Sequence, residues 1–162
     1  MEKQLTLDYK IVKACAFTGH RILEKDFSLN ELKKQIKNVV ENGVEIFYNG
    51  MAQGFDLISA EVVLSMKKKN PQIKLIACVP FYGQERNFSE EDKERYVKIL
   101  KKADEVVYLS DTYYKGCMLV RDRYMADRGD MIITYCKKQT GGTAYTVKYF
   151  QKKYPEKEII FL

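Results

Sequence analysis

The sequence has a single histidine, no tryptophan and only three prolines among its 162 residues. With His20 as the only imidazole, a zinc site would need an unusual ligand set, so we expect no metal centre. Four cysteines are present, at Cys15, Cys78, Cys117 and Cys136, and none forms the short C-x-x-C spacing that is typical of metal or redox sites. Three of them, all but Cys117, lie in apolar runs that predict strands, so we expect small, reduced core residues.

Long apolar segments are also missing. No stretch approaches the roughly 20 consecutive apolar residues of a membrane helix, and Met1-Glu2-Lys3-Gln4 lacks the start of a secretory signal. We therefore expect a cytoplasmic protein without a membrane partner. The formal net charge of +6 suits an anionic ligand, but the lysines are spread over segments such as 33–37, 67–69 and 98–102. Such runs are typical of solvated helix faces.

Short apolar segments alternate with amphipathic ones along the whole chain. Strands are predicted over residues 13–18, 45–48, 74–79, 105–109, 130–136 and 158–162, with a helix between each consecutive pair. Strands that are apolar on both faces indicate a mostly parallel sheet covered on both sides. We therefore predict one domain over residues 1–162, with a Rossmann-like, doubly wound α/β fold and helices on both faces of the sheet.

Six of the nine glycines come directly after predicted strands: Gly19, Gly50, Gly54, Gly83, Gly141 and Gly142. Open parallel sheets bind ligands beyond the carboxyl ends of their strands. Glycine lets backbone amides approach an anion, and a helix N-terminus favours phosphate. Because residues 50–54 and 141–143 each open a predicted helix, we expect both segments to cradle phosphate. The P-loop and G-x-G-x-x-G patterns are absent, which disfavours a P-loop nucleotidase and an ordinary NAD dehydrogenase.

Polar and aromatic side chains of these loops complete the predicted site. Asp56 either contacts ribose hydroxyls or caps the second helix. Arg21 either pairs with a phosphate or lies free on the surface, and Tyr82 either stacks on a base or covers the sheet edge. The predicted ligand-binding residues are Thr18, Gly19, His20, Arg21, Gly50, Met51, Ala52, Gly54, Asp56, Tyr82, Gln84, Arg121, Arg123, Gly141, Gly142 and Thr143.

Four segments resemble the YpsA-like branch of the SLOG superfamily, the Rossmann-like group that includes the DprA and LOG proteins. They are TGHR at 18–21, GMAQGFD at 50–56, RDRYM at 121–125 and GGTAYT at 141–146, and together they run through nearly the whole chain. The resemblance implies a pocket for a nucleotide or a nucleotide-derived molecule, with no other cofactor. SLOG relatives are often dimers, so it also makes a homodimer an expectation.

The resemblance leaves three functions open. The first is a cytoplasmic sensor or regulator that binds a nucleotide derivative of the ADP-ribose or nucleotide-sugar type. The second is a LOG-like N-glycosidase, in which Arg121 is similar to the LOG arginine. The LOG glutamate is missing from residues 144–146, so Asp122 or Asp56 would have to replace it as the catalytic carboxylate. The third is a DprA-like module for single-stranded nucleic acid, which the basic charge favours but for which the 12 tyrosines show no visible organisation.

Overall fold

The computed structural model describes residues 12–162. Met1-Glu2-Lys3-Gln4, on which the expectation about secretion rests, therefore lies outside the described residues. Within the described part of the chain, no helix is both long and apolar enough to cross a membrane.

The secondary structure follows the predicted order of alternating strands and helices. The elements are β1 (Lys13–Gly19), α1 (Leu29–Glu41), β2 (Val44–Asn49), α2 (Phe55–Lys67), β3 (Lys74–Val79), the 3-10 turn η1 (Gln84–Asn87), α3 (Glu90–Lys102), β4 (Glu105–Tyr108), α4 (Cys117–Arg128), β5 (Met131–Tyr135), α5 (Gly142–Lys153) and β6 (Glu158–Phe161). Serine hydroxyls cap two helix starts: Ser28 accepts from the Glu31 N–H at 3.1 Å and Ser89 from the Asp92 N–H at 3.2 Å.

The six strands form one sheet in the order β4-β3-β2-β1-β5-β6, and all five pairings are parallel. The chain adds β2, β3 and β4 on one side of β1, then crosses back to place β5 and β6 on the other side. This reversal confirms the predicted doubly wound fold. It also places the switch point, where ligands of such sheets bind, between β1 and β5.

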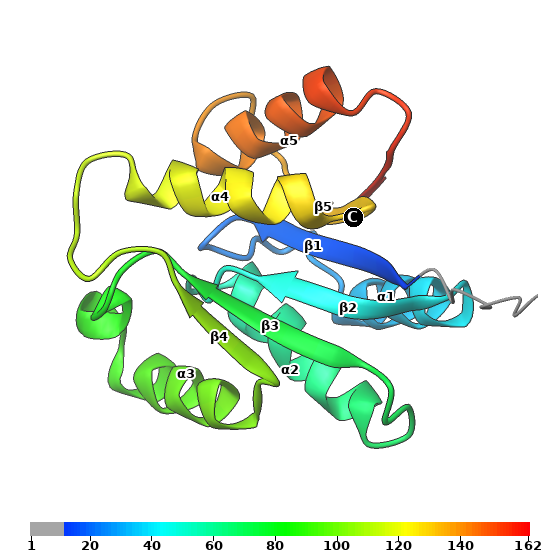
Figure 1. The fold of residues 1–162 in the computed structure, drawn as a ribbon, viewed down its shortest axis with the longest axis horizontal. Coiled ribbons are helices and arrows are strands. Elements are labelled where there is room, and N and C mark those ends of the chain that lie inside the picture. The colour runs from blue at the N-terminus through cyan, green and yellow to red at the C-terminus, as the bar shows by residue number, and fades with distance from the viewer. Residues whose placement is uncertain (1–11) are drawn as a thin grey trace, which may run out of the picture.

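Helices cover the sheet on two faces. In Figure 1, α4 and α5 lie above the sheet, and α2 and α3 lie below it. β1 is buried on both sides: Cys15 and Phe17 belong to the core cluster that includes α1 and α2 residues, and Ala16 packs with Met125 and Phe150 of α4 and α5. The cysteine prediction needs one correction. All four thiols are free, but Cys136 follows the end of β5 and is only partly buried.

The start of α2 packs directly on the loop that follows β1. The Phe55 N–H donates to the His20 carbonyl at 3.1 Å. Gly54, just before the helix, has a φ of +77°, and a Cβ there would lie 2.2 Å from the Arg21 carbonyl oxygen. Only glycine permits both this left-handed backbone and this close approach. Two of the predicted ligand loops are thus joined through their backbones.

Because of this contact, we expect a methyl group at Gly54 to lower the free energy of unfolding strongly. Gly54→Ala combines an unfavourable φ with a collision against backbone, so we expect a loss of about 3 kcal/mol or more in the free energy of unfolding. Gly43 is a matched control, because its φ is +99° and a Cβ there meets nothing within 4 Å. Gly43→Ala should cost only about 1–2 kcal/mol. Equal losses in urea denaturation would contradict a tight contact at Gly54.

Candidate functional site

A hollow of about 360 Å³, here called the switch-point cleft, opens where β1 and β5 end. It brings together eleven residues that the sequence analysis named: Thr18, Gly19, His20, Arg21, Ala52, Asp56, Arg121, Asp122, Gly141, Gly142 and Thr143. They come from the end of β1 and the loop after it, from the loops that lead into α2 and α5 with the first turns of those helices, and from α4. The cleft therefore lies where open sheets of this type bind ligands.

The first turn of α5 offers free backbone amides to this cleft. Gly141 precedes the helix with a φ of +96° and gives it no side-chain cap. The first amide bonded within the helix is that of Tyr145, which donates to the Gly141 carbonyl at 2.9 Å. Uncapped amides and the positive end of the helix dipole favour an anion. Gly142 and Thr143 line the cleft, so this turn has the chemistry of a phosphate site.

Cationic side chains surround the same opening. Arg21 and Lys138 both line the cleft and are exposed, and neither side chain makes a hydrogen bond or ion pair within residues 12–162. Arg21 thus lies at the mouth of the cleft, where it can pair with a phosphate. Both side chains are available to an anionic ligand.

His20 ties two of the loops together and adds no positive charge. Its Nε2 accepts a hydrogen bond from the Lys137 N–H at 2.7 Å, so the neutral ring carries its proton on Nδ1. Burial, reinforced by the nearby charge of Lys138, lowers the pKa of His20 below its ordinary value. A neutral His20 therefore links the loop after β1 to the loop after β5.

Asp56 is a buried carboxylate with an unused oxygen. Its Oδ2 accepts from the Ala52 N–H at 3.2 Å, while its Oδ1 is buried without a hydrogen-bond partner. Burial raises the pKa of Asp56 to about 7, even though the charge of Arg121 acts in the opposite direction. The capping alternative is wrong, because α2 begins after Gly54 without a side-chain cap.

Asn49 holds the loop between β2 and α2 in shape. Its Nδ2 donates to the Asp56 carbonyl at 2.8 Å, and its Oδ1 accepts from the Met51 N–H at 2.9 Å. Met51 has a φ of +61°, a strained conformation for a residue with a side chain. The amides of Met51, Ala52 and Phe55 all bond to the protein itself. The first turn of α5 is therefore a better candidate for phosphate than residues 50–54.

The guanidinium of Arg121 lines the cleft and also joins α4 to the loop after β2. The residue is 5% exposed, and its Nε donates to Asp122 Oδ1 at 2.7 Å. Its Nη1 donates to the Gly50 carbonyl, which also accepts from Gln84 Nε2 at 3.2 Å. A Cβ at Gly50 would lie 2.9 Å from the guanidinium. Gly50 and Gln84 are thus brought to Arg121, but Gly50 does not line the cleft.

A second hollow of about 380 Å³ adjoins the first. The two hollows share Arg21, Ala52 and Met118 in their linings. The second hollow is also lined by Gln84, whose Oε1 is buried without a partner, and by Tyr113, which is 64% exposed. Together the two hollows extend the site from the switch point toward the end of β3.

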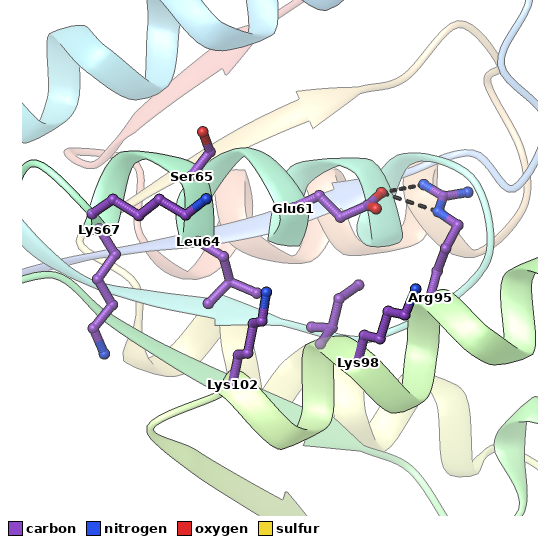
Figure 2. A pocket seen from close by; sticks show the side chains of 9 residues that line it. Glu61, Leu64, Ser65, Lys67, Arg95, Lys98 and Lys102 are labelled. Carbon is purple, nitrogen blue, oxygen red and sulfur yellow. Dashed lines mark hydrogen bonds and ion pairs between the residues drawn. The ribbon is translucent and has the colours of Figure 1, made fainter.

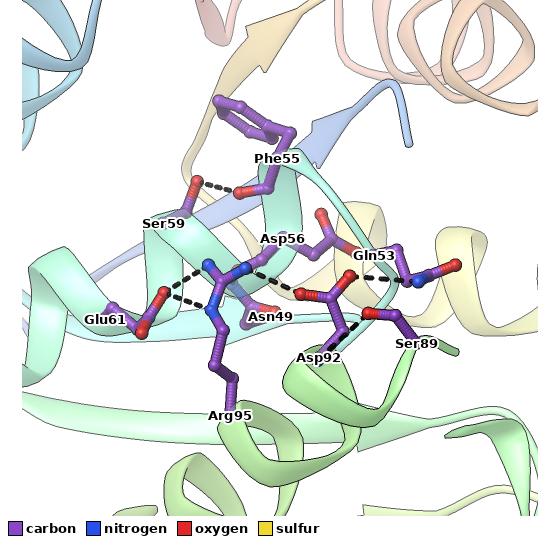
Figure 3. Close-up of polar contacts among 9 residues, drawn as sticks. All are labelled: Asn49, Gln53, Phe55, Asp56, Ser59, Glu61, Ser89, Asp92 and Arg95. Carbon is purple, nitrogen blue, oxygen red and sulfur yellow. Dashed lines mark hydrogen bonds and ion pairs between the residues drawn. The ribbon is translucent and has the colours of Figure 1, made fainter. Parts of the chain in front are cut away.

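Gln53, which also lines the second hollow, is fixed by a polar network (Figure 3). Its Nε2 donates to Asp92 Oδ2 at 3.0 Å, and Asp92 Oδ1 accepts from Arg95 Nη1 at 2.8 Å. Arg95 Nε donates in turn to Glu61 Oε1 at 3.1 Å. The loop after β2 is therefore anchored to α3 as well as to α2.

Several expected ligand contacts lie elsewhere. Tyr82 stacks on Tyr108 with a ring separation of 3.9 Å, which agrees with the alternative that it covers the sheet edge. Arg123 donates to the Tyr145 hydroxyl at 2.9 Å, on the exposed side of α4. Gly50, Met51 and Gly54 do not line either hollow. These five residues lie near the cleft but do not line it.

Some cleft residues that follow β5 were not predicted from the sequence. Lys137, Lys138 and Thr140 line the cleft together with Met118 of α4. The signal was present, since residues 137–140 connect a strand end to the glycines at 141 and 142. Lysine at such a place faces the ligand edge of the sheet, unlike lysine on an outer helix face.

A parallel six-stranded sheet with a glycine-lined cleft at its switch point defines the Rossmann-like class of α/β proteins. Within that class the chain belongs to the YpsA family, because the family model, described as the YspA SLOG family, matches residues 16–161. The resemblance to the YpsA-like branch of the SLOG superfamily is thereby confirmed.

Two bacterial relatives illustrate the family. The UPF0398 protein BH1768 of Halalkalibacterium halodurans is 30% identical over 124 residues, which is 75% of this chain and 66% of that protein. The UPF0398 protein YpsA of Bacillus subtilis is 26% identical over 155 residues, which is 88% of this chain and 86% of that protein.

Solved structures support the fold. The DNA processing protein A (DprA) of Streptococcus pneumoniae superposes with a TM-score of 0.68 at 18% identity, covering 94% of this chain and 50% of that one. DprA of Helicobacter pylori, described for its single-stranded DNA binding mode, has a TM-score of 0.66 at 18% identity, over 92% of this chain and 64% of that one. This chain thus spans about half to two thirds of the DprA chains.

The raised pKa of Asp56 predicts a stability that depends on pH. The unfolded carboxyl loses its proton near pH 3.8 and the folded one near pH 7. Between these values the folded state holds the extra proton, so the contribution of Asp56 to the free energy of unfolding is fully present below pH 3.8 and is lost as pH rises to 7, by up to about 4 kcal/mol. Asp56→Asn should remove this slope, so urea denaturation should show the variant gaining stability relative to the parent as pH rises.

Asp127→Asn is a control in which the effect on stability should change with pH in the opposite direction. Burial acts to raise the pKa of Asp127, but hydrogen bonds from Lys153, Tyr149 and Tyr154 hold it below its ordinary value. Its contribution is present above the unfolded pKa and is lost as pH falls, so this variant should be most destabilised near neutral pH. If Asp56→Asn changes stability equally at pH 4 and pH 8, Asp56 does not titrate as stated.

Proposed function

We propose that the switch-point cleft binds the phosphate of a nucleotide or nucleotide derivative, and that the protein acts as a cytoplasmic sensor or regulator. The observation that carries the proposal is the uncapped first turn of α5, which lines a cleft at the switch point of a parallel sheet. Arg21 and Lys138, both without protein partners among the described residues, supply compensating charge at its mouth. Amides, dipole and cations acting together favour a phosphate group.

The sugar of the ligand would lie toward Asp56. A buried acceptor without a partner costs about 1–3 kcal/mol, so a hydroxyl group that donates to Asp56 Oδ1 recovers that free energy. A ribose supplies such donors, as an acidic residue does for the ribose in dinucleotide-binding folds. Asp56 therefore favours a nucleotide over inorganic phosphate.

The second hollow favours a ligand with more than one ring or sugar. Its volume of about 380 Å³ is similar to the 360 Å³ of the switch-point cleft. Each is within the range of roughly 300–1,000 Å³ that is typical of small-molecule sites. Because Arg21 lines both, a single anionic linker between two units would stay next to that guanidinium. A molecule of the ADP-ribose or nucleotide-sugar type has this form.

The α5 site can be tested with a carboxylate at position 142. Gly142 begins the helix, and a Cβ there finds only Asp122 Oδ2, at 3.9 Å, so small side chains fit. Gly142→Asp should preserve the fold, since acidic residues suit a helix N-terminus, and should repel a phosphate. At hundredfold excess over Kd a ligand stabilises by about 2.7 kcal/mol, or a rise in Tm of about 5–10 °C. We expect this rise for the parent and for Gly142→Ala, and its loss in Gly142→Asp.

The ligand panel for this measurement contains nucleoside monophosphates, ADP-ribose and nucleotide sugars, with inorganic phosphate and free nucleosides as references. A rise in Tm with phosphate alone would argue against the role given to Asp56. The proposal fails if no nucleotide raises Tm, or if Gly142→Asp keeps the full rise.

A second candidate is the binding of single-stranded nucleic acid in the same two hollows. It is supported by the DprA neighbours, one of which is described as binding single-stranded DNA. The exposed ring of Tyr113 at the second hollow adds a surface on which a base can stack. Adjacent nucleotides of one strand would occupy the two hollows.

This candidate predicts oligonucleotide binding that depends on salt and on one tyrosine. The logarithm of the affinity for a short oligothymidylate should fall with log salt by about 0.7 per neutralised phosphate. Tyr113→Ala should weaken binding by about 1–3 kcal/mol. Tyr114→Ala is the control, because Tyr114 is exposed but lines neither hollow. Binding that ignores salt, or equal losses in both variants in fluorescence anisotropy, would rule this candidate out.

A further inference from the structure

Two lysine-rich segments that are about 30 residues apart in the sequence meet across one groove (Figure 2). The groove runs between the C-terminal half of α2 and α3 and has a volume of about 540 Å³. From the sequence, both segments were expected to be solvated helix faces. The structure instead places them on the two sides of a common depression, here called the α2–α3 groove.

The groove has an apolar floor and a cationic rim. Leu64 of α2 and Ile99 of α3 line it at its base, with Ile99 buried in the core and Leu64 partly buried. Lys68, Lys98 and Lys102 line its edges and are exposed. Within residues 12–162 none of these three ammonium groups takes part in a hydrogen bond or an ion pair. Their charges are thus available to an acidic partner.

Ion pairs join the two sides of the groove at both of its ends. Arg95 of α3 bonds to Glu61 of α2 at one end. At the other end, Lys67 of α2 bonds to Asp104, which follows α3. These pairs leave Lys68, Lys98 and Lys102 as the cations of the groove that a partner can neutralise.

We propose that the α2–α3 groove docks an acidic amphipathic helix of a partner protein. Leucine-like side chains of such a helix would cover Leu64 and the aliphatic stems of the lysines beside it, and its carboxylates would face the three free ammonium groups. The observations favour a protein over a nucleic acid, because no aromatic side chain of residues 12–162 lines this groove and single strands bind through stacking. The proposal is independent of the ligand of the switch-point cleft.

The test uses a labelled helical peptide of roughly 15 residues, with leucines on one face and glutamates beside them. A scrambled peptide of the same composition is its reference. The intact protein should bind the amphipathic peptide in fluorescence anisotropy, and Lys98→Glu combined with Lys102→Glu should weaken binding at least about tenfold. The matched control reverses Lys33 and Lys37 of α1, which are exposed at the same spacing and lie outside the groove.

Leu64→Ser separates the apolar contact from the charge effect. It leaves the net charge unchanged and should weaken binding of the amphipathic peptide. Circular dichroism confirms that each variant is folded before binding is compared. The proposal is overturned if the parent binds neither peptide at about 1 mM, if it binds both equally, or if both charge-reversal variants lose affinity to the same extent. Displacement of the peptide by oligothymidylate together with equal binding of Leu64→Ser would assign the groove to nucleic acid.

Discussion

The guanidinium of Arg121 holds together the part of the molecule on which the candidate site depends. It joins α4 to the loop after β2 through the Gly50 carbonyl and is neutralised by Asp122. Burying an ion pair costs desolvation free energy unless the charges are well bonded, and removing one partner leaves the other uncompensated. The same contact explains why residue 50 is glycine, since any side chain would meet the guanidinium. The LOG-like role of this arginine therefore competes with a structural one.

The loop between Asn49 and Asp56 contains two features that lower the stability of the folded state. Met51 adopts a positive φ, and Asp56 is a buried carboxylate with an unpartnered oxygen. Strain and unsatisfied polar groups that gather in one segment indicate a functional constraint more often than a packing need. A carboxyl with a pKa near 7 is also suited to proton transfer. The N-glycosidase hypothesis stays open through Asp56, although residues 144–146 in the first turns of α5 supply no carboxylate.

The sequence predicted the fold well because its signals are local and periodic. Apolar runs marked the strands, and the glycines that follow them marked the turns. The positions of loops at strand ends followed from the parallel topology. The directions of single side chains could not be predicted from these signals. Tyr82 and Arg123 sit in the right segments but turn toward Tyr108 and Tyr145, because ring stacking and hydrogen bonding between distant residues decide that direction.

The second hollow of the candidate site and the α2–α3 groove are joined by one chain of polar contacts. Arg95 bonds to Glu61, which lines the groove, and to Asp92, which bonds to Gln53 of the second hollow. A partner that changed the Arg95–Glu61 pair would therefore also change what holds Gln53. Binding at two sites is coupled only where each ligand favours the same arrangement of a shared element, and the coupling is then reciprocal. In this fold the shared element is α2, whose first turn borders the cleft and whose second half forms one wall of the groove.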